Sequence, residues 1–171
     1  MGRGFSRHRV GAPIGREALI RLRILAIGRL RAGLFKELQT FYAARIIPPP
    51  TIIELETKQR LPPALLKARE AELILDALPL GTPLIALDRR GSLWSSRELA
   101  DRLAMWRNRG AAELGFAIGG AEGLDPMVVD HAAAVLSLGT MTWPHFLARG
   151  MLLEQLYRAQ QILAGHPYHR E

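Results

Sequence analysis

Short apolar runs alternate with longer segments of mixed polarity along most of this chain. The apolar runs have the length and composition of buried strands, and the longer segments repeat their apolar residues at the spacing of a helix. Strands that alternate with helices build a mostly parallel sheet with helices on both faces. The alternation therefore predicts an α/β fold, and it limits the possible architectures more than any other feature of the sequence.

Local signals mark where several of these elements begin. Ser95 and Glu98 have the spacing of a capping box, and Asp125 stands before Pro126 as an N-cap before a first-turn proline. The predicted strands are 22–28, 51–56, 83–88, 113–120 and 135–143. The predicted helices are 34–46, 62–78, 95–110, 125–134 and 146–165. We expect them to form one domain over residues 21–171.

Composition narrows the chemistry that this domain can perform. The chain has 49% hydrophobic residues, which is enough to build a core and argues against a disordered protein. It has no cysteine, which excludes disulfides, zinc–thiolate sites and cysteine nucleophiles. No apolar run approaches the roughly 20 residues of a membrane span. The lack of cysteine fits a reducing compartment, and we expect a cytoplasmic protein that does not enter a membrane.

The positive charge is concentrated at the beginning of the chain. The formal net charge is +7, and residues 1–23 contain six arginines against the single acid Glu17. This glycine-rich segment has no apolar periodicity, so residues 1–20 are expected to form a flexible basic extension. It could be a tag remnant, a start codon assigned too early, a targeting peptide or a phosphate-binding arm. Without it the domain is only mildly basic.

Ligands of open parallel sheets bind beyond the carboxyl ends of the strands, which directs attention to the loops after Asp88, Ile118 and Leu138. The stretch "IGGAEGLD" (118–125) groups three glycines directly after a strand. Glycine lets a ligand approach the backbone closely, although the same residues also suit a tight turn. The pattern is neither a phosphate loop nor a dinucleotide fingerprint.

Two further stretches lie at the same predicted edge. In "SLGTMTWPH" (137–145), backbone groups could bind the edge of an adenine, or the segment could be a simple connection. His145, near the start of the last helix, could be a catalyst, a cap or a surface residue. In "RRGSLWSSRE" (89–98), Arg89 and Arg90 could bind phosphate or belong to a solvated loop.

The chain closes with "HPYHRE" (166–171), which is unusually rich in reactive side chains. The segment could be a frayed tail, a metal site or part of an active site. His166 and His169 have no evident third ligand, and Pro167 breaks helical geometry between them, so we expect no metal site. Glu154 and Arg158 are four residues apart on the last helix and could pair.

Several of these stretches occur together in one known family. The stretches are "LRILAIG" (22–28), "LDRRGSLWSSRELA" (87–100), "IGGAEGLD", "LSLGTMTWPH" and "LLEQLYRAQQILAGHPYHRE" (152–171). In this order and spacing the chain resembles the RlmH family, the ribosomal large subunit pseudouridine methyltransferases of the SPOUT superfamily. The resemblance covers residues from about 21 to 171.

The resemblance implies a parallel-sheet SPOUT methyltransferase fold with a C-terminal trefoil knot and a homodimer. It implies S-adenosylmethionine as the cofactor and, as substrate, the N3 of a pseudouridine in the 23S rRNA of the assembled ribosome. The cofactor-binding positions that it implies are Leu87, Gly120, Gly139, Thr140, Met141, Thr142, Trp143 and Pro144. The positions that it implies around the substrate are His145, Glu154, Tyr168, His169 and Arg170. Ala121 and Phe146 replace the family's usual prolines.

The residues themselves suggest how such a reaction would proceed. Without cysteine, a cysteine adduct to a ring carbon is excluded, so a ring nitrogen is the better methyl acceptor. An imide nitrogen must lose its proton, and His145 or His169 could accept it. Arg170 could stabilise the resulting anion or hold a phosphate, and Tyr168 could stack on a base. A non-catalytic RNA-binding protein and a small-molecule enzyme are the alternatives, although no nucleophile–base pair supports the second.

Overall fold

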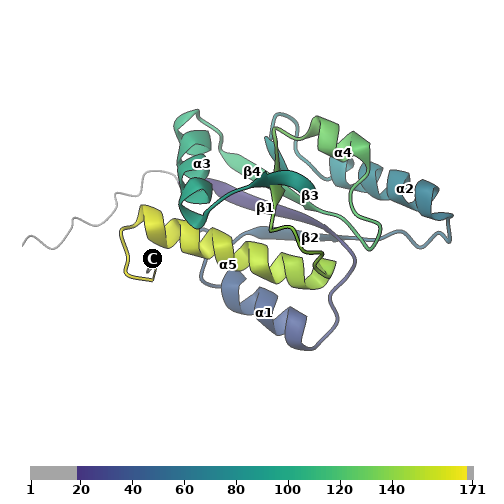
Figure 1. The fold of residues 1–171 in the computed structure, drawn as a ribbon, viewed down its shortest axis with the longest axis horizontal. Helices are drawn as coiled ribbons and strands as arrows, with labels where there is room; N and C mark the ends of the chain where they lie inside the picture. Colours follow the sequence, from purple (N-terminus) through teal and green to yellow (C-terminus); the bar gives the residue numbers. More distant parts are fainter. Residues whose placement is uncertain (1–18, 169–171) are drawn as a thin grey trace, which may run out of the picture.

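A computed structural model of the protein describes residues 19–168 and contains one five-stranded, entirely parallel sheet with the strand order β2-β1-β4-β3-β5 (Figure 1). The strands are β1 (Arg21–Ile27), β2 (Thr51–Leu55), β3 (Leu84–Leu93), β4 (Glu113–Ile118) and β5 (Ala134–Ser137). The helices are α1 (Leu34–Ala43), α2 (Pro63–Asp76), α3 (Ser96–Asn108), α4 (Pro126–His131) and α5 (His145–Leu163). The predicted α/β class and the order of elements are confirmed.

Helices cover both faces of the sheet, as the alternation predicts. Helix α5 packs against α1 and α3 on one face, and α2 and α4 lie together on the other (Figure 1). Each face has its own buried apolar cluster, built around Ile24 and Phe116 on the first and around Leu25 and Ala117 on the second. The central strands β1 and β4 contribute to both clusters, which explains why their sequences are almost continuously apolar.

Strand β3 is longer than predicted, and the interpretation of residues 89–98 as a loop is wrong for its first half. Leu87 and Ser92 are both aligned with Leu136 of β5, so residues 88–91 form a wide bulge within the strand. A Cβ atom on Gly91 would lie 2.7 Å from the backbone of Val135, so this close approach requires glycine. Residues 88–91 are polar and contain glycine, as turns usually do. In this protein they form a bulge between the paired strands β3 and β5 instead of a loop.

Strand β5 is shorter than predicted and ends at Ser137 instead of residue 143. The hydroxyl of Ser137 donates to the carbonyl of Gly139 and accepts from its N–H, at 2.9 and 3.3 Å. Gly139 has φ 129°, a conformation that L-residues rarely adopt. The chain therefore leaves the sheet at once, and residues 138–144 form a loop that carries their side chains beyond its edge.

The predicted helix caps are confirmed. Ser95 Oγ accepts a hydrogen bond from Glu98 N at 3.1 Å, and Glu98 Oε2 accepts one from Ser95 N at 2.6 Å. Asp125 Oδ1 accepts from Met127 N at 2.9 Å at the start of α4. No helix between residues 19 and 168 is long and apolar enough to cross a membrane. The basic extension lies outside the described residues, and both it and the trefoil knot stay predictions.

Candidate active site

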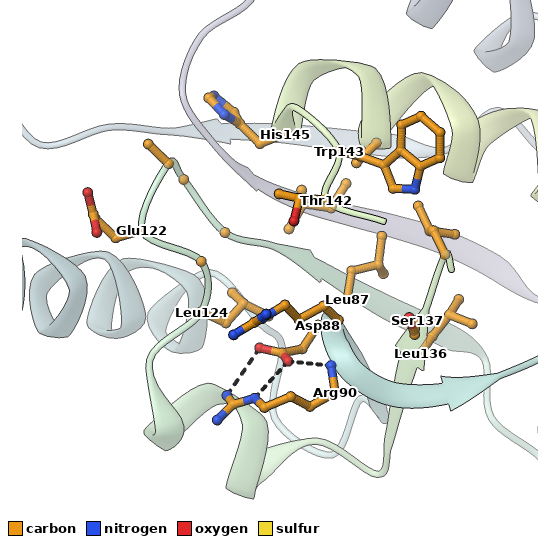
Figure 2. Close-up of a pocket in the computed structure, with 18 of the residues that line it drawn as sticks. Leu87, Asp88, Arg90, Glu122, Leu124, Leu136, Ser137, Thr142, Trp143 and His145 are labelled. Atoms are coloured by element: carbon orange, nitrogen blue, oxygen red, sulfur yellow. Dashed lines mark hydrogen bonds and ion pairs between the residues drawn. The ribbon is translucent and has the colours of Figure 1, made fainter. Parts of the chain in front are cut away.

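A cavity of about 500 Å³ lies at the carboxyl edge of the sheet, where the neighbouring strands β4, β3 and β5 end (Figure 2). Its walls come from the β3 bulge, from the glycine loop after β4, and from the loop that joins β5 to α5. These are the three places where the parallel topology predicts a ligand. Segments that are far apart in the sequence thus build one concave surface.

The glycine loop after β4 folds back on itself tightly. The N–H of Gly123 donates to the carbonyl of Gly120 at 3.1 Å, and Gly123 has φ 74°. A Cβ atom on Gly119 would lie 2.5 Å from the carbonyl carbon of Gly123, a distance that no side chain permits. The loop therefore depends on glycine for its shape, and it presents backbone atoms to the cavity in place of side chains.

Apolar side chains line the interior of the cavity next to this loop. Leu87 and Leu136 come from the adjoining strands β3 and β5, and Leu124 follows the glycine loop. Figure 2 shows Thr142 and Trp143 on the loop that leads into α5. Apolar side chains beside exposed backbone groups form a surface suited to a flat heterocycle, whose faces need apolar contacts and whose edge needs hydrogen bonds.

Charged groups surround this apolar interior. Arg90 donates to both carboxylate oxygens of Asp88, from Nε at 3.0 Å and Nη2 at 3.3 Å, as the dashed lines in Figure 2 mark. These hydrogen bonds hold the pKa of Asp88 below its usual value. Glu122 lines the opposite side, and burial together with Glu122 raises the pKa of Glu70 behind Gly120. The cavity therefore contains both signs of charge.

His145, the first residue of α5, also lines the cavity. Its ring lies 4.0 Å from the ring of Phe146, between centroids, and its Nε2 lies 3.3 Å from the position that a Cβ on Gly28 would take. Burial lowers the pKa of His145, and the positive charge of Arg149 lowers it further. A neutral imidazole at neutral pH can accept a proton, which is the property of a general base.

Arg149 lies one helical turn beyond His145 and has no exposed surface. Its Nη1 donates to Glu54 at 2.8 Å and to Gln39 at 3.3 Å, and its Nη2 donates to the carbonyl of Gly28 at 2.8 Å. Its Nε has no hydrogen-bond partner among residues 19–168. These contacts join the start of α5 to the ends of β1 and β2. We did not predict this role, because an arginine within an apolar helix normally has its charged end in solvent.

The last described residues form a second polar cluster at a different place on α5. Arg158 Nε donates to Glu154 Oε1 at 3.0 Å, which confirms the predicted pair, and Tyr168 Oη donates to the same oxygen at 3.3 Å. The Tyr168 ring packs against Tyr157 with 4.8 Å between centroids. Burial, a hydrogen bond with Tyr42 and nearby charge raise the pKa of Tyr168 to about 12.

The structure does not bring these residues together with His145 within one chain. Glu154 lies nine positions after His145, which corresponds to about 13–14 Å along a helix. Glu154 lines a separate cavity of about 520 Å³, together with Trp94, Ser96 and Gln155. Both cavities share residues 136–139, so they adjoin at the end of β5. His169 and Arg170 lie outside the described residues.

The positions that the resemblance implies for the cofactor divide into two groups. Six of them line the cavity: Leu87, Gly120, Gly139, Met141, Thr142 and Trp143. Thr140 and Pro144 belong to the same loop but do not line the cavity, and Pro144 occupies the N-cap position of α5. Asp88 and Glu122, which line the cavity, were not predicted. The available signal was their position: Asp88 is the last residue of the predicted strand 83–88, and Glu122 lies two residues beyond the predicted strand 113–120. Within residues 19–168, no group of three or more potential ligands could hold a metal ion.

Comparison with known sequences finds methyltransferases over most of the chain. The family model described as "Predicted SPOUT methyltransferase" matches residues 20–169. The "Ribosomal RNA large subunit methyltransferase H" of Rhodospirillum centenum is 49% identical over 151 residues, which cover 88% of this chain and 99% of that protein. The protein of the same name from Acidiphilium cryptum is 51% identical over 150 residues, which cover 88% of this chain and 94% of that one.

Solved structures with low sequence identity share the fold. A probable methylase family protein from Haemophilus influenzae aligns with a TM-score of 0.56 at 13% identity, over 90% of this chain and 72% of that one. A methylase family protein from Neisseria gonorrhoeae aligns with a TM-score of 0.52 at 15% identity, over 94% of this chain and 91% of that one. At such identities the likeness concerns the fold alone.

Proposed function

The chain belongs to the SPOUT methyltransferase family, and on this premise we propose that it methylates N3 of a pseudouridine in the 23S rRNA of assembled ribosomes. Its cofactor is S-adenosylmethionine. The relatives' names support the large-subunit rRNA as the substrate. The choice of pseudouridine N3 rests on the resemblance of "IGGAEGLD", "LSLGTMTWPH" and the closing "HPYHRE" to the pseudouridine methyltransferases.

The cavity at the carboxyl edge of the sheet is the observation that carries this proposal. Six of the eight residues expected to bind the cofactor line it, although they come from strand β3 and from two separate loops. Its leucines are suited to pack on an adenine, and the backbone of residues 137–139 is suited to bind the adenine edge. The tight glycine loop leaves room for a ligand against bare backbone. When bound, S-adenosylmethionine supplies an activated methyl group on a sulfonium sulfur.

Proton removal from the base is the step that this chain's own residues must provide. An imide nitrogen becomes a good nucleophile only when its proton leaves. His145 is the candidate acceptor among the described residues, because it lines the cavity and its lowered pKa favours the neutral imidazole. Arg149 holds the first turn of α5 against the ends of β1 and β2, and this fixes the position of His145. Fixed geometry of this kind contributes to the rate as orientation.

We further propose that the enzyme acts as a homodimer, in which the closing residues of one chain reach the cavity of the other. Glu154 and Tyr168 do not line the cavity that contains His145. A second copy could supply these side chains where one chain does not. Exposed apolar residues at the two adjoining cavities support such an interface: Leu93 at the second cavity is 61% exposed, and Met141 at the first is 67% exposed. Because the proposed substrate is the ribosome, we expect the enzyme to act in the cytoplasm.

The direct test uses purified protein and ribosomes from a strain that lacks this methylation. With S-adenosylmethionine, mass spectrometry of 23S rRNA fragments should show one added methyl on a single pseudouridine, positioned at N3. Naked 23S rRNA, as the matched substrate, should be methylated far more slowly. Methylation of another base, or of small-subunit rRNA, would overturn the assignment.

A non-catalytic RNA-binding protein with the same fold is the competing function. It would bind ribosomes without binding S-adenosylmethionine, so calorimetry with the cofactor alone separates the two. For the dimer, mixing His145→Ala chains with chains that lack residues 168–171 provides the test. Each variant alone should be inactive, and the mixture should recover activity at mixed active sites. No recovery after subunit exchange would contradict a shared site.

A further inference from the structure

The bulge in β3 places consecutive cationic side chains at the cavity, and their environments differ. Arg89 and Arg90 both line the cavity and are exposed. The charge of Arg90 is largely compensated, because its guanidinium pairs with both oxygens of Asp88 and its N–H donates to the same carboxylate at 2.9 Å. Arg89, by contrast, has no hydrogen bond or salt bridge among the described residues.

A second cation without a salt bridge lies on the same cavity. Lys67, in the second turn of α2, lines the cavity from the face of the sheet that α2 covers. Among the described residues it interacts only with Asp88, through an attraction weaker than an ion pair. Asp88 is already occupied by Arg90. Lys67 and Arg89 therefore present positive charge that the protein itself does not neutralise.

The position of this charge indicates what it binds. Cations gain little from remaining unpaired beside a cavity, whereas a phosphodiester brought close to them gains charge-assisted hydrogen bonds and releases counterions. The bulge itself depends on Gly91, so the backbone departs from a regular strand where Arg89 reaches the cavity. Most of the other cavity walls consist of leucines, glycines and carboxylates, which offer phosphate no cationic partner.

We propose that Lys67 and Arg89 bind a phosphate of the rRNA backbone beside the target nucleotide, and so position the base over the methyl-donor cavity. This inference rests on the proposed function and adds to it the residues that hold the substrate strand. Phosphate contacts fix register and orientation without reading sequence. The pair is therefore a positioning device for RNA and takes no part in proton transfer.

The test compares Lys67→Gln/Arg89→Gln with Arg21→Gln/Arg107→Gln. The control removes the same charge from the amino end of β1 and from the last turn of α3, and neither residue lines the cavity. The KM of the cavity variant for ribosomes should be about tenfold higher than that of the wild type. The slope of log KM against log salt concentration should be smaller by about 1 for each phosphate contact that is lost. The variant's kcat at saturating ribosomes and its Kd for S-adenosylmethionine should stay within twofold of wild type. The control should resemble wild type in all four quantities.

Two outcomes would overturn the inference. A weaker Kd for S-adenosylmethionine with unchanged salt dependence would assign the cations to the carboxylate of the cofactor. An unchanged KM for ribosomes would show that neither cation contacts the substrate strand. Both outcomes leave methylation by the wild type intact, so they are distinct from failure of the proposed function. That failure would appear as absence of methylation by the wild type itself.

Discussion

The first turn of α5 carries different chemistry from its middle, where Glu154 meets Tyr168 from beyond the helix, although the family resemblance assigns both regions to one reaction. At its beginning, His145 lies partly buried in the cavity, and Arg149 is fully buried against the ends of β1 and β2. Farther along, Glu154 pairs with Arg158 and Tyr168 at a surface that leaves Tyr168 36% exposed. The first region lowers a histidine pKa, and the second raises a tyrosine pKa to about 12.

This difference teaches that one chain completes only part of the proposed site. The region around His145 is already formed within one chain: His145 is half-buried, contacts Phe146 and lines the cavity. The region around Tyr168 has a hydrogen-bonded cluster but lies on a separate cavity. The proposed function predicts that substitutions around His145 affect the chemical step and cofactor binding. Substitutions around Tyr168 should instead affect dimer assembly and substrate binding. The following variants separate these effects.

The largest effect is expected from His145→Ala. Loss of a general base typically lowers kcat by about 10²–10⁴-fold, while the Kd for S-adenosylmethionine should change little. Single-turnover methylation of ribosomes and calorimetry with the cofactor measure the two quantities. His131→Ala, an exposed histidine at the end of α4, is the matched control and should keep wild-type rates. A kcat within threefold of wild type would remove His145 from proton transfer.

Gly119→Ala should weaken cofactor binding by about ten- to a hundredfold, because a clash in a packed site costs about 1–3 kcal/mol. Its Cβ would lie 2.5 Å from the backbone of Gly123, so the glycine loop must open to accept it. Calorimetry with S-adenosylmethionine measures the change. Thr140→Ala serves as the comparison, since Thr140 is exposed and does not line the cavity. Equal losses in both variants would contradict the cavity as the cofactor site.

The pH dependence of kcat should follow the lowered pKa of His145. The neutral imidazole is the active form, so kcat should reach a plateau toward neutral pH and fall about tenfold per pH unit below a midpoint that lies under 6.5. The same depressed pKa contributes stability that is present above pH 6.5 and is lost as the pH falls. Single-turnover rates between pH 5 and 8 provide the test. A midpoint above 6.5 would point to a different base.

The smallest effect is expected from Tyr168→Phe. It removes the exposed hydrogen bonds of the Tyr168 hydroxyl with Glu154, at 3.3 Å, and with Tyr42, which should lower the free energy of unfolding by about 1 kcal/mol. Denaturant unfolding measures this, and the Kd for S-adenosylmethionine should be unchanged. If the variant instead lost cofactor affinity, the two regions of α5 would form one site within a single chain, and the comparison above would fail.

Periodicity and caps allowed most of the fold to be predicted, because strands and helices of this type are encoded locally. The starts of α3 and α4 at Ser95 and Asp125 are examples. The β3 bulge was missed because Gly91 accommodates β5, a strand more than forty residues away along the chain. The early end of β5 was missed because residues 138–143 remain fairly apolar outside the sheet.

The site was predictable where its residues follow strands and unpredictable where they depend on packing. The glycine loop and Gly139 could be identified because parallel strands end at one edge. Arg149 could not, because its partners Gln39 and Glu54 lie 110 and 95 residues away and nothing local connects them. The separation of Glu154 from His145 is likewise a property of the assembled α5.

The contact between Arg149 and Glu54 also affects how the chain folds during its synthesis. Glu54 and Gln39 leave the ribosome long before α5 does, and strand β1 must wait for β4 to pair on its second side. Contacts of such sequence separation form slowly and late. During synthesis the early strands therefore remain exposed and dependent on protection from aggregation. We expect ribosome-bound chains that end before residue 145 to be protease-sensitive, and full-length chains to become resistant only after release.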